Sequence, residues 1–553
     1  MEDKGMLTGN LWKAIPLFAF PVAATSILEQ LSSLIATVVI GKVPGPEGTL
    51  GMAAVGANTP IMSLILNLFI GISLGTNVVI ANAIGRDDQQ TVTRAVHTSV
   101  LMSLIGFAMV IIGELYAEPL LAALSVPAET LPTAALFLRV YLLGMPSILL
   151  YNFEAAIFRS VGITRMPLQA LMVSTVVNVG LDLVFVPVLH WGVAGLAAAS
   201  AIAYTLSAAT LFYRLTKTSS PVRLDPRKLR IDGAVLARIV RIGLPAGLQS
   251  AVFALANTII QAGINSLGTE VMAASSAAMS LEYVFYNLLN SFSQACTTFV
   301  GQAFGARDIP RCKQVLKVCL AEDLVVAIAT AASVVFFGKS ILAVFNSDPN
   351  VVSIGYIRVC TIFPAYIFSM CYENFSGYLR GFGISLAPAI LTALGICGIR
   401  FWWVFGVFPA HHDFQTIMLV YPISLCVTAI LIVSSALAIH PAKTYGKKDV
   451  DSTAVAVAAQ PPSRDAEGRL RVQVLPVRAG LGATLNGELG AAVQTAQTGG
   501  ALGLRPGGQA AVHLDGVDRA SPRAQPAAHA GVHVDGELAR VLACRDAEAV
   551  VDF

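Results

Sequence analysis

Long hydrophobic segments alternate with short polar segments along the first 440 residues of the chain. A helix needs about 20 predominantly apolar residues to cross a bilayer. Segments of at least this length lie near residues 13–40, 52–83, 95–116, 133–158, 167–189, 192–213, 236–264, 271–303, 314–337, 352–378, 386–408 and 413–440. The pattern therefore predicts twelve transmembrane helices.

Basic residues between these segments are concentrated in alternate connections. One set of connections holds Lys4, Lys13, Arg86, Arg94, Arg159, Arg165, Arg214, Lys217, Arg223, Arg227, Lys228, Arg230, Arg238, Arg241, Arg307, Arg311, Lys313, Lys317, Arg380, Lys443, Lys447 and Lys448. The other set holds little more than Lys42 and Lys339. Because short cytoplasmic loops are enriched in Lys and Arg, both termini are predicted to be cytoplasmic. The regular alternation also supports the number of helices, since a missed helix would disrupt every later loop.

Three sequence motifs occur twice at a spacing near 220 residues. The pairs are ANAIGRDD (81–88) with GQAFGARD (301–308), LRVYLLGMP (138–146) with IRVCTIFPA (357–365), and FRSVGITRMP (158–167) with LRGFGISLAP (379–388). Six helices per repeat is an even number, so both repeats have the same orientation in the membrane. We predict an all-α integral membrane protein with two parallel six-helix lobes, 1–215 and 234–445, related by a pseudo-twofold axis along the membrane normal. Residues 216–233 form the cytoplasmic linker.

The composition changes after this bundle. Residues 449–553 contain no Lys, Ile, Met, Tyr or Trp, and no further 20-residue apolar segment occurs. Two interpretations of the tail at 446–553 stay open: a disordered cytoplasmic segment, or the product of a shifted reading frame. Neither interpretation gives the tail a function of its own.

The amino-acid composition limits the classes of function that the protein can have. Of 553 residues, 55% are hydrophobic and 12% are charged, and the mean hydropathy is +0.71. These values indicate an integral membrane protein, whereas the formal net charge of +3 gives no reason to expect a nucleic-acid partner. The eight cysteines form no C-x-x-C pair, and no Gly-rich phosphate loop with Lys is present, so neither a zinc site nor direct ATP hydrolysis is indicated. We expect a protein that is not an enzyme and needs no cofactor.

Polar residues interrupt three of the predicted helices of the first lobe at similar depths. At ~1.5 Å per residue, Asp182 and Ser200 lie level with each other, and Glu29 lies level with Asn178. Asn178 and Asp182 share a helix face because they are four residues apart. A charged side chain at mid-bilayer is costly and is a functional candidate by default. We predict that these four residues form a site for H⁺ or Na⁺. A purely structural role for Asp182, bonded to Asn178, is the alternative.

The second lobe has its own polar candidates. Glu282, Tyr372, Glu373 and Asn374 are expected near the central cavity, with Arg400 as the partner of Glu373 or as part of a purely structural ion pair.

Three further charged groups have structural explanations. Glu154 is expected to form a helix-end salt bridge with Arg159. The equivalent residues Arg139 and Arg358 are expected to snorkel to the interface.

These residues resemble the multidrug and toxic compound extrusion family of transporters, of the prokaryotic type. The resemblance covers roughly residues 8–445 and rests on the two lobes, on an early proline in the first helix of each (Pro21 and Pro245), on the G-x-R-D loops and on N-x-x-x-D in the fifth helix. It implies a cation site at Asn178, Asp182 and Ser200. The acid that the family places in its first helix is replaced by Ala36, and Glu29 is the nearest substitute.

The resemblance also implies a function. We expect a monomeric secondary exporter of small organic molecules, often cations, in the bacterial cytoplasmic membrane. It would exchange substrate for H⁺ or Na⁺ while its lobes rock within the lipid bilayer. The alternative in the same superfamily is a flippase or exporter of a lipid-linked or polar metabolite. The identity of the substrate and the choice between H⁺ and Na⁺ are not encoded in any motif of the sequence.

Overall fold

The computed structural model describes residues 5–124, 126–345 and 348–441, together with short strands at 463–464, 470–471, 501–505 and 509–513. The chain divides into two units, Met1–Ala442 and Lys443–Phe553. In the second unit, β1 (Ser463–Arg464) pairs antiparallel with β2 (Leu470–Arg471), and β3 (Ala501–Arg505) with β4 (Gln509–His513). The rest of the predicted tail lies outside the described residues, so its two interpretations stay open.

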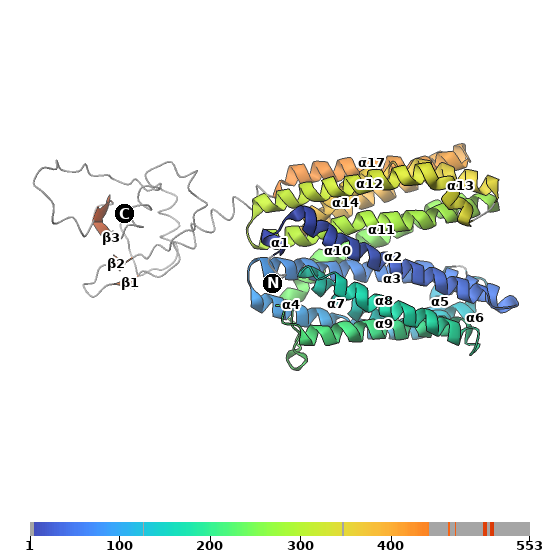
Figure 1. Cartoon of the computed structure of the whole chain (residues 1–553), viewed down its shortest axis with the longest axis horizontal. Coiled ribbons are helices and arrows are strands. Elements are labelled where there is room, and N and C mark those ends of the chain that lie inside the picture. The colour runs from blue at the N-terminus through green and yellow to red at the C-terminus, as the bar shows by residue number, and fades with distance from the viewer. Residues whose placement is uncertain are drawn as a thin grey trace, which may run out of the picture. The chain divides into compact units, whose positions relative to one another are not determined.

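The first unit is a bundle of long helices in two lobes (Figure 1). The first lobe contains α1 (Gly5–Thr8), α2 (Leu11–Gly41), α3 (Pro46–Gly85), α4 (Gln89–Met102), α5 (Ile105–Ala123), α6 (Leu131–Leu143), α7 (Met145–Ser160), α8 (Arg165–Phe185) and α9 (Gly192–Lys217). The second contains α10 (Gly233–Asn265), α11 (Thr269–Gly305), α12 (Ile309–Phe345), α13 (Pro349–Ile362), α14 (Tyr366–Gly381), α15 (Leu386–Thr392), η2 (Ala393–Gly398), α16 (Ile399–Trp402), η3 (Trp403–Val407), η4 (Phe408–Ala410) and α17 (Phe414–Ile439).

Each predicted transmembrane segment coincides with a helix or a broken helix. Two spans are bent, by 47° between α6 and α7 and by 46° between α13 and α14. The bends fall at the repeated motif that contains Pro146 and Pro364, because proline cannot continue the hydrogen-bond pattern of a helix. Of the described helices, nine are long and apolar enough to cross a membrane, or up to eleven when each bent pair is one span.

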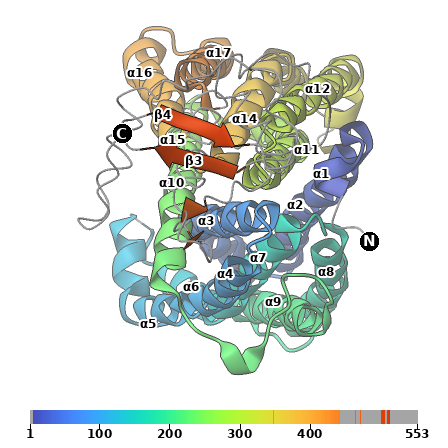
Figure 2. The same cartoon turned by 90° about the vertical axis from the view of Figure 1, so that its left-hand side faces the viewer.

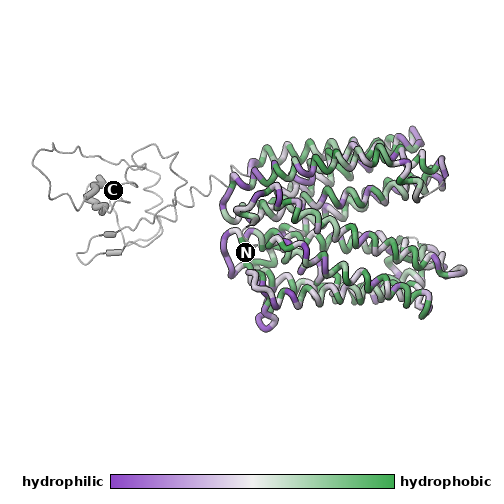
Figure 3. The backbone as a smooth tube through the Cα atoms, viewed as in Figure 1, coloured by the Kyte–Doolittle hydropathy of each residue, from purple (hydrophilic) through white to green (hydrophobic). Residues whose placement is uncertain are grey.

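The remaining predicted span is α11, which does not belong to that apolar set. Its buried face includes Glu282, Ser291, Ser293, Thr297 and Gln302, which lower its hydropathy. Helices α2, α3, α12 and α14 surround α11. Polar side chains are thus carried inside the bundle, whereas the rest of the helical bundle is predominantly hydrophobic (Figure 3).

The repeated loops GRDD (85–88) and GARD (305–308) each end in an acid that caps the next helix. Asp88 accepts a hydrogen bond from the Thr91 amide at 3.0 Å at the start of α4, and Asp308 accepts one from the Arg311 amide at 3.0 Å at the start of α12. Hydrogen bonds from the Thr91 side chain and amide lower the pKa of Asp88. These acids therefore stabilise two equivalent helix starts.

One end of the bundle carries the segment 218–232 between the lobes, and we refer to it as the linker side; the sequence predicts it to be cytoplasmic. Figure 2 shows this end, with the linker as a green loop beyond α9. The short helix η1 (Pro226–Lys228) lies in this segment.

The two lobes pack closely along α3 and α10. A Cβ atom on Gly71 would lie 2.1 Å from the Gly247 Cα, and a Cβ atom on Gly75 would lie 2.9 Å from the Gly243 nitrogen. Glycine is required there because a side chain would separate the backbones. Nearer the linker side, a Cβ on Gly85 would lie 2.0 Å from the Gln302 carbonyl oxygen. These contacts lie on the linker-side halves of the helices, so the lobes meet at that side.

Candidate ion and substrate sites

Asp182 and Asn178 lie together inside the first lobe, as the sequence predicts. Both are on α8, and Asp182 has no exposed surface. The Asn178 Nδ2 donates to Asp182 Oδ2 at 3.5 Å, whereas Asp182 Oδ1 is buried without a hydrogen-bond partner. In the described residues no Lys, Arg or His forms a salt bridge with Asp182. The site is therefore a carboxylate that lacks a compensating cation.

The first helix reaches this site through Ser32. The Ser32 Oγ donates to Asn178 Oδ1 at 2.9 Å and so connects α2 with α8. Sequence reasoning missed Ser32 because it searched α2 for a second carboxylate. A signal was available, since Ser32 lies one helical turn beyond Glu29 and close to the depth of Asn178.

The other two predicted members, Ser200 and Glu29, form no hydrogen bond with this chain in the described structure. Ser200 is partly exposed on α9 and donates no hydrogen bond to Asn178 or Asp182 in the described structure. Helices α8 and α9 are instead joined by the buried hydroxyls of Ser174 and Ser207, 2.5 Å apart. Ala36 is partly buried against the hydrophobic core and supplies no polar group.

Glu29 belongs to a different group of side chains. The charge nearest in effect to its carboxyl group is that of Arg159. The Arg159 Nη1 also donates to Gln294 Oε1 of α11 at 3.4 Å, so this group reaches the second lobe.

The predicted salt bridge between Glu154 and Arg159 is wrong. Glu154 has no exposed surface, and neither carboxylate oxygen has a hydrogen-bond partner among the described residues. The error arose because depth along the chain does not show which way a side chain points.

Glu282 forms a buried ion pair that the sequence did not predict. Arg358 of α13 donates to both carboxylate oxygens of Glu282, at 2.5 and 2.9 Å, and to Ser275 Oγ at 2.6 Å. Because Arg358 is 1% exposed, the expectation that it snorkels to the interface is wrong. Its equivalent Arg139 is partly exposed and lies 3.3 Å from Glu118 and 3.8 Å from Glu114.

Glu373 pairs with Arg380 rather than with Arg400. Arg380 Nη2 lies 3.4 Å from Glu373 Oε2, and the Tyr286 hydroxyl donates to Glu373 Oε1 at 3.2 Å. Arg400 Nη1 instead donates to Asn257 Oδ1 at 2.5 Å, and its guanidinium lies 4.7 Å from the centre of the Tyr421 ring. The prediction failed because Arg380, which lies about two helical turns beyond Glu373, was placed in a cytoplasmic connection.

Asn374 bonds to an acid that sequence reasoning missed. Its Nδ2 donates to Asp323 Oδ2 of α12 at 2.6 Å, and both side chains have no exposed surface. The signal was the acidic pair at 322–323 within the apolar segment 314–337. Tyr372, predicted near the cavity, is 1% exposed and lies in the interior of the second lobe.

Two equivalent amides connect the lobes near the linker side. The Asn82 Nδ2 donates to the Gly381 carbonyl at 3.5 Å, and the Gln302 Nε2 donates to the Ser160 carbonyl at 2.7 Å. The repeat thus places the same kind of bond on both sides of the pseudo-twofold axis.

Comparison with known proteins decides which family this arrangement represents. The family model MatE matches residues 21–184 and 245–404, one segment in each lobe. The chain belongs to the MatE family. Its two lobes are therefore the two MatE repeats, and the prediction of the fold and of the family is confirmed.

Curated relatives of this MatE chain are named as probable multidrug resistance proteins or, in one case, as a transporter. "Probable multidrug resistance protein YoeA" of Bacillus subtilis is 24% identical over 76% of the chain and 93% of the relative. "Probable multidrug resistance protein NorM" of Neisseria meningitidis serogroup B is 26% identical over 71% and 88%. The "FAD transporter" of Shewanella oneidensis is 24% identical over 62% and 73%.

Solved structures support the same fold. A MATE structure in complex with MaL6 is 21% identical, covers 80% of this chain and all of that chain, and has a TM-score of 0.73. A MOP superfamily transporter from Pyrococcus furiosus is 22% identical, with 80% and 99% coverage and a TM-score of 0.72. The chain is thus a multi-pass membrane protein of a transporter family.

Proposed function

We propose that this MatE protein exports small organic molecules, commonly cations, in exchange for H⁺ or Na⁺ that binds at Asp182. The single observation that carries the proposal is the state of Asp182: a fully buried carboxylate with one unpartnered oxygen and no salt bridge to any of the described residues. Holding such a charge inside a membrane costs at least roughly 2.5–3.5 kcal/mol. A bound proton or Na⁺ would remove that cost, so the ion has a reason to bind there.

The hydrogen-bonded chain from Ser32 to Asn178 and Asp182 supports a coupling role. It joins α2 to α8, so a change in the charge of Asp182 alters the contact between these helices. Helix α2 also contacts the second lobe through Phe18, whose ring lies 5.7 Å from that of Phe299. Ion binding would thus favour one arrangement of the two lobes over another. The lobes contact each other at the linker side. This contact supports a state in which the substrate cavity between the lobes opens toward the opposite side.

The orientation and setting follow from the same proposal. The linker side would face the cytoplasm of a bacterium, with both termini on that side, and a monomer would perform the full cycle. Substrate would leave toward the outside as the ion moves inward. The small-molecule substrate would bind between the lobes.

An anionic or polar metabolite is the second candidate substrate, in a flippase or exporter of the same superfamily. Arg400 favours it, since this buried cation contacts Asn257, Ser424 and two aromatic rings but forms no salt bridge in the described part of the chain. The relative named as a transporter of FAD, an anion, gives the same indication.

Transport by purified protein in liposomes tests the proposal. With imposed pH or Na⁺ gradients, Asp182→Asn should reduce gradient-driven uptake of a cationic dye to the level of empty liposomes while retaining dye binding. The double variant Glu373→Gln/Arg380→Met is the matched control, because these two charges already neutralise each other and their joint removal should preserve gradient dependence. Normal ion-dependent transport by Asp182→Asn would overturn the mechanism. Competition by FAD but not by a second cationic dye would favour the alternative substrate class.

A further inference from the structure

The linker between the lobes is folded against the first lobe. Val222 and Leu224 are buried (0% and 1% exposed), and the Leu224 amide donates to the Leu215 carbonyl at 3.0 Å. The Gln89 Nε2 donates to the Pro221 carbonyl at 2.6 Å. These contacts hold the linker over the ends of α4 and α9.

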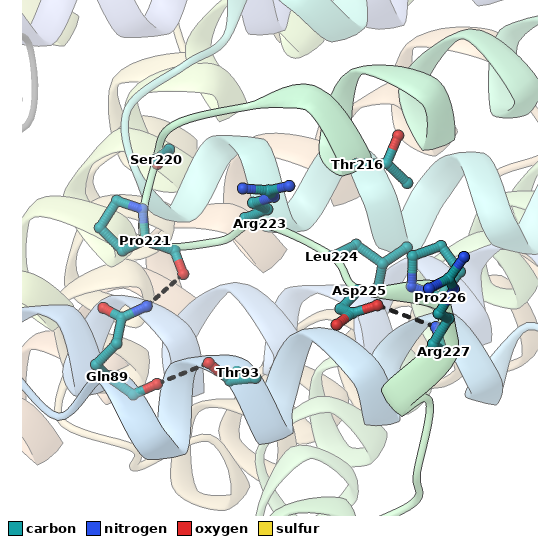
Figure 4. A pocket seen from close by; sticks show the side chains of 10 residues that line it. All are labelled: Gln89, Thr93, Thr216, Ser220, Pro221, Arg223, Leu224, Asp225, Pro226 and Arg227. Carbon is teal, nitrogen blue, oxygen red and sulfur yellow. Dashed lines mark hydrogen bonds between the residues drawn. The ribbon is translucent and has the colours of Figure 1, made fainter.

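A basic pocket of about 560 Å³ lies beneath this folded linker (Figure 4). Arg223 and Arg227 line it together with Gln89, Thr93 and Thr216. Neither arginine forms a salt bridge among the described residues.

Two further residues define the chemistry of the basic pocket. The Asp225 carboxylate interacts with Lys228 at 3.5 Å and accepts a hydrogen bond from the Arg227 amide at 3.1 Å. The hydroxyl of Ser220, also in the wall, is buried without a hydrogen-bond partner. Two uncompensated guanidinium groups and an unpartnered hydroxyl fit a phosphate group.

An apolar slot begins where the basic pocket ends. It has a volume of about 500 Å³ and is lined by Leu150 of α7 and by Ala208, Ala209, Phe212 and Tyr213 of α9, among others. Thr216 lines both the slot and the basic pocket, so the two are adjoining.

The slot has the length of one bilayer leaflet. It extends along α9 from Thr205 to Thr216, which is about 16 Å at ~1.5 Å per residue. Half of the hydrocarbon core measures about 15 Å. Tyr213 is 61% exposed, so the slot lies on a surface that faces lipid.

We propose that the basic pocket and the apolar slot together bind one anionic phospholipid from the leaflet on the linker side. An acyl chain lies in the slot, and the phosphate contacts Arg223 and Arg227. An excess of basic residues on the cytoplasmic side does not by itself explain why a slot of leaflet length ends at two arginines that form no salt bridge among the described residues. The bound lipid would hold the linker against α9, and the site is separate from the residues proposed to bind the coupling ion.

Native mass spectrometry of the purified full-length protein tests this site. Dioleoyl-phosphatidylglycerol is titrated against wild type, with dioleoyl-phosphatidylcholine and soluble glycerol phosphate as separate ligands. The first variant is Arg223→Gln/Arg227→Gln, and the charge-matched control is Arg230→Gln/Arg238→Gln, whose side chains neither line the basic pocket nor pair with Asp225. A third variant, Ala209→Trp, fills the slot without a change of charge. All four mutated basic residues are exposed, so the variants are expected to fold.

We expect phosphatidylglycerol to bind wild type, with affinity about tenfold or more lower in Arg223→Gln/Arg227→Gln and similarly reduced in Ala209→Trp. The control should stay within about threefold of wild type, because its side chains do not contact the phosphate. Equal losses in both double variants would overturn the proposal and show a general surface-charge effect. Equal binding of phosphatidylcholine, or tighter binding of glycerol phosphate than of the lipid, would also overturn it.

Discussion

The two lobes have the same helical plan but differ in whether their buried glutamates and aspartates form salt bridges. In the first lobe, Asp182 and Glu154 are fully buried and form no salt bridge in the described structure. In the second lobe, Glu282 and Glu373 each face an arginine. A paired carboxylate is already neutralised, whereas an isolated one must bind a cation to become neutral. The two lobes thus share their architecture but differ in whether these buried acids are paired with arginine.

Asp323 resembles the buried acids of the first lobe rather than Glu282 and Glu373. It is a second-lobe acid whose Oδ1 is buried without a partner, and Asn374 is its hydrogen-bond donor rather than an arginine. Substitutions in both lobes are therefore needed to test whether they differ in this way.

The largest effect is expected from Arg358→Met. This change leaves Glu282 buried without its cation, and breaking a buried pair in this way costs about 3–5 kcal/mol. Thermal unfolding in detergent should show a large loss of stability. Asp182→Asn should change the free energy of unfolding by less than about 1 kcal/mol, because it removes a charge that has no partner.

The double variant Glu282→Gln/Arg358→Met is the control for this prediction. It removes both charges and should recover most of the lost stability. If Arg358→Met were no more destabilising than Asp182→Asn, the two lobes would not differ as the structure indicates.

The next effect concerns Asp323→Asn. If ion exchange belongs to the first lobe, this variant should retain gradient-driven transport within about threefold of wild type, or roughly 0.7 kcal/mol. The measurement is the same liposome assay, with Asp182→Asn beside it. Loss of gradient dependence in Asp323→Asn alone would move the coupling site to the second lobe.

A modest effect is expected at the contact where the two lobes are alike. Asn82→Ala and Gln302→Ala each remove one bond between lobes, worth about 0.5–1.5 kcal/mol. Spin labels at the exposed positions Gln90 and Lys313 should report similar increases in the population with separated linker sides. A strong effect of only one variant would show that the lobes are also unequal at this contact.

Much of the fold could be predicted from the sequence because length and hydropathy determine it. The twelve spans and the repeat depend on local properties of the chain, whereas the bends at Pro146 and Pro364 were not predicted. Helix α11 was found by length although its hydropathy is low, since its polar residues lie within an otherwise apolar segment.

The candidate sites could be predicted only in part. Asn178 and Asp182 lie one helical turn apart, so helix geometry alone brings them together. Ser32, Arg358 and Asp323 contact residues on other helices, and their partners depend on the rotation of each helix about its axis. The position of a residue along a helix gives its height in the membrane but not the rotation of that helix about its axis. For this reason the sequence analysis paired Arg400 and Arg159 with the wrong acids.

Single substitutions in α2 distinguish Ser32 from Glu29 as the contribution of this helix to the proposed ion site. Ser32→Ala removes one hydrogen bond to Asn178, worth about 0.5–1.5 kcal/mol, so half-maximal transport should require about twofold to tenfold more ion. Glu29→Gln should shift this concentration less, because Glu29 forms no hydrogen bond to Asn178 or Asp182 in the described residues. The initial rate of dye transport, measured against pH and Na⁺ concentration, gives both values. A larger shift in Glu29→Gln, with partial restoration by Ala36→Asp, would instead identify Glu29 as the substitute for the acid that the first helix lacks.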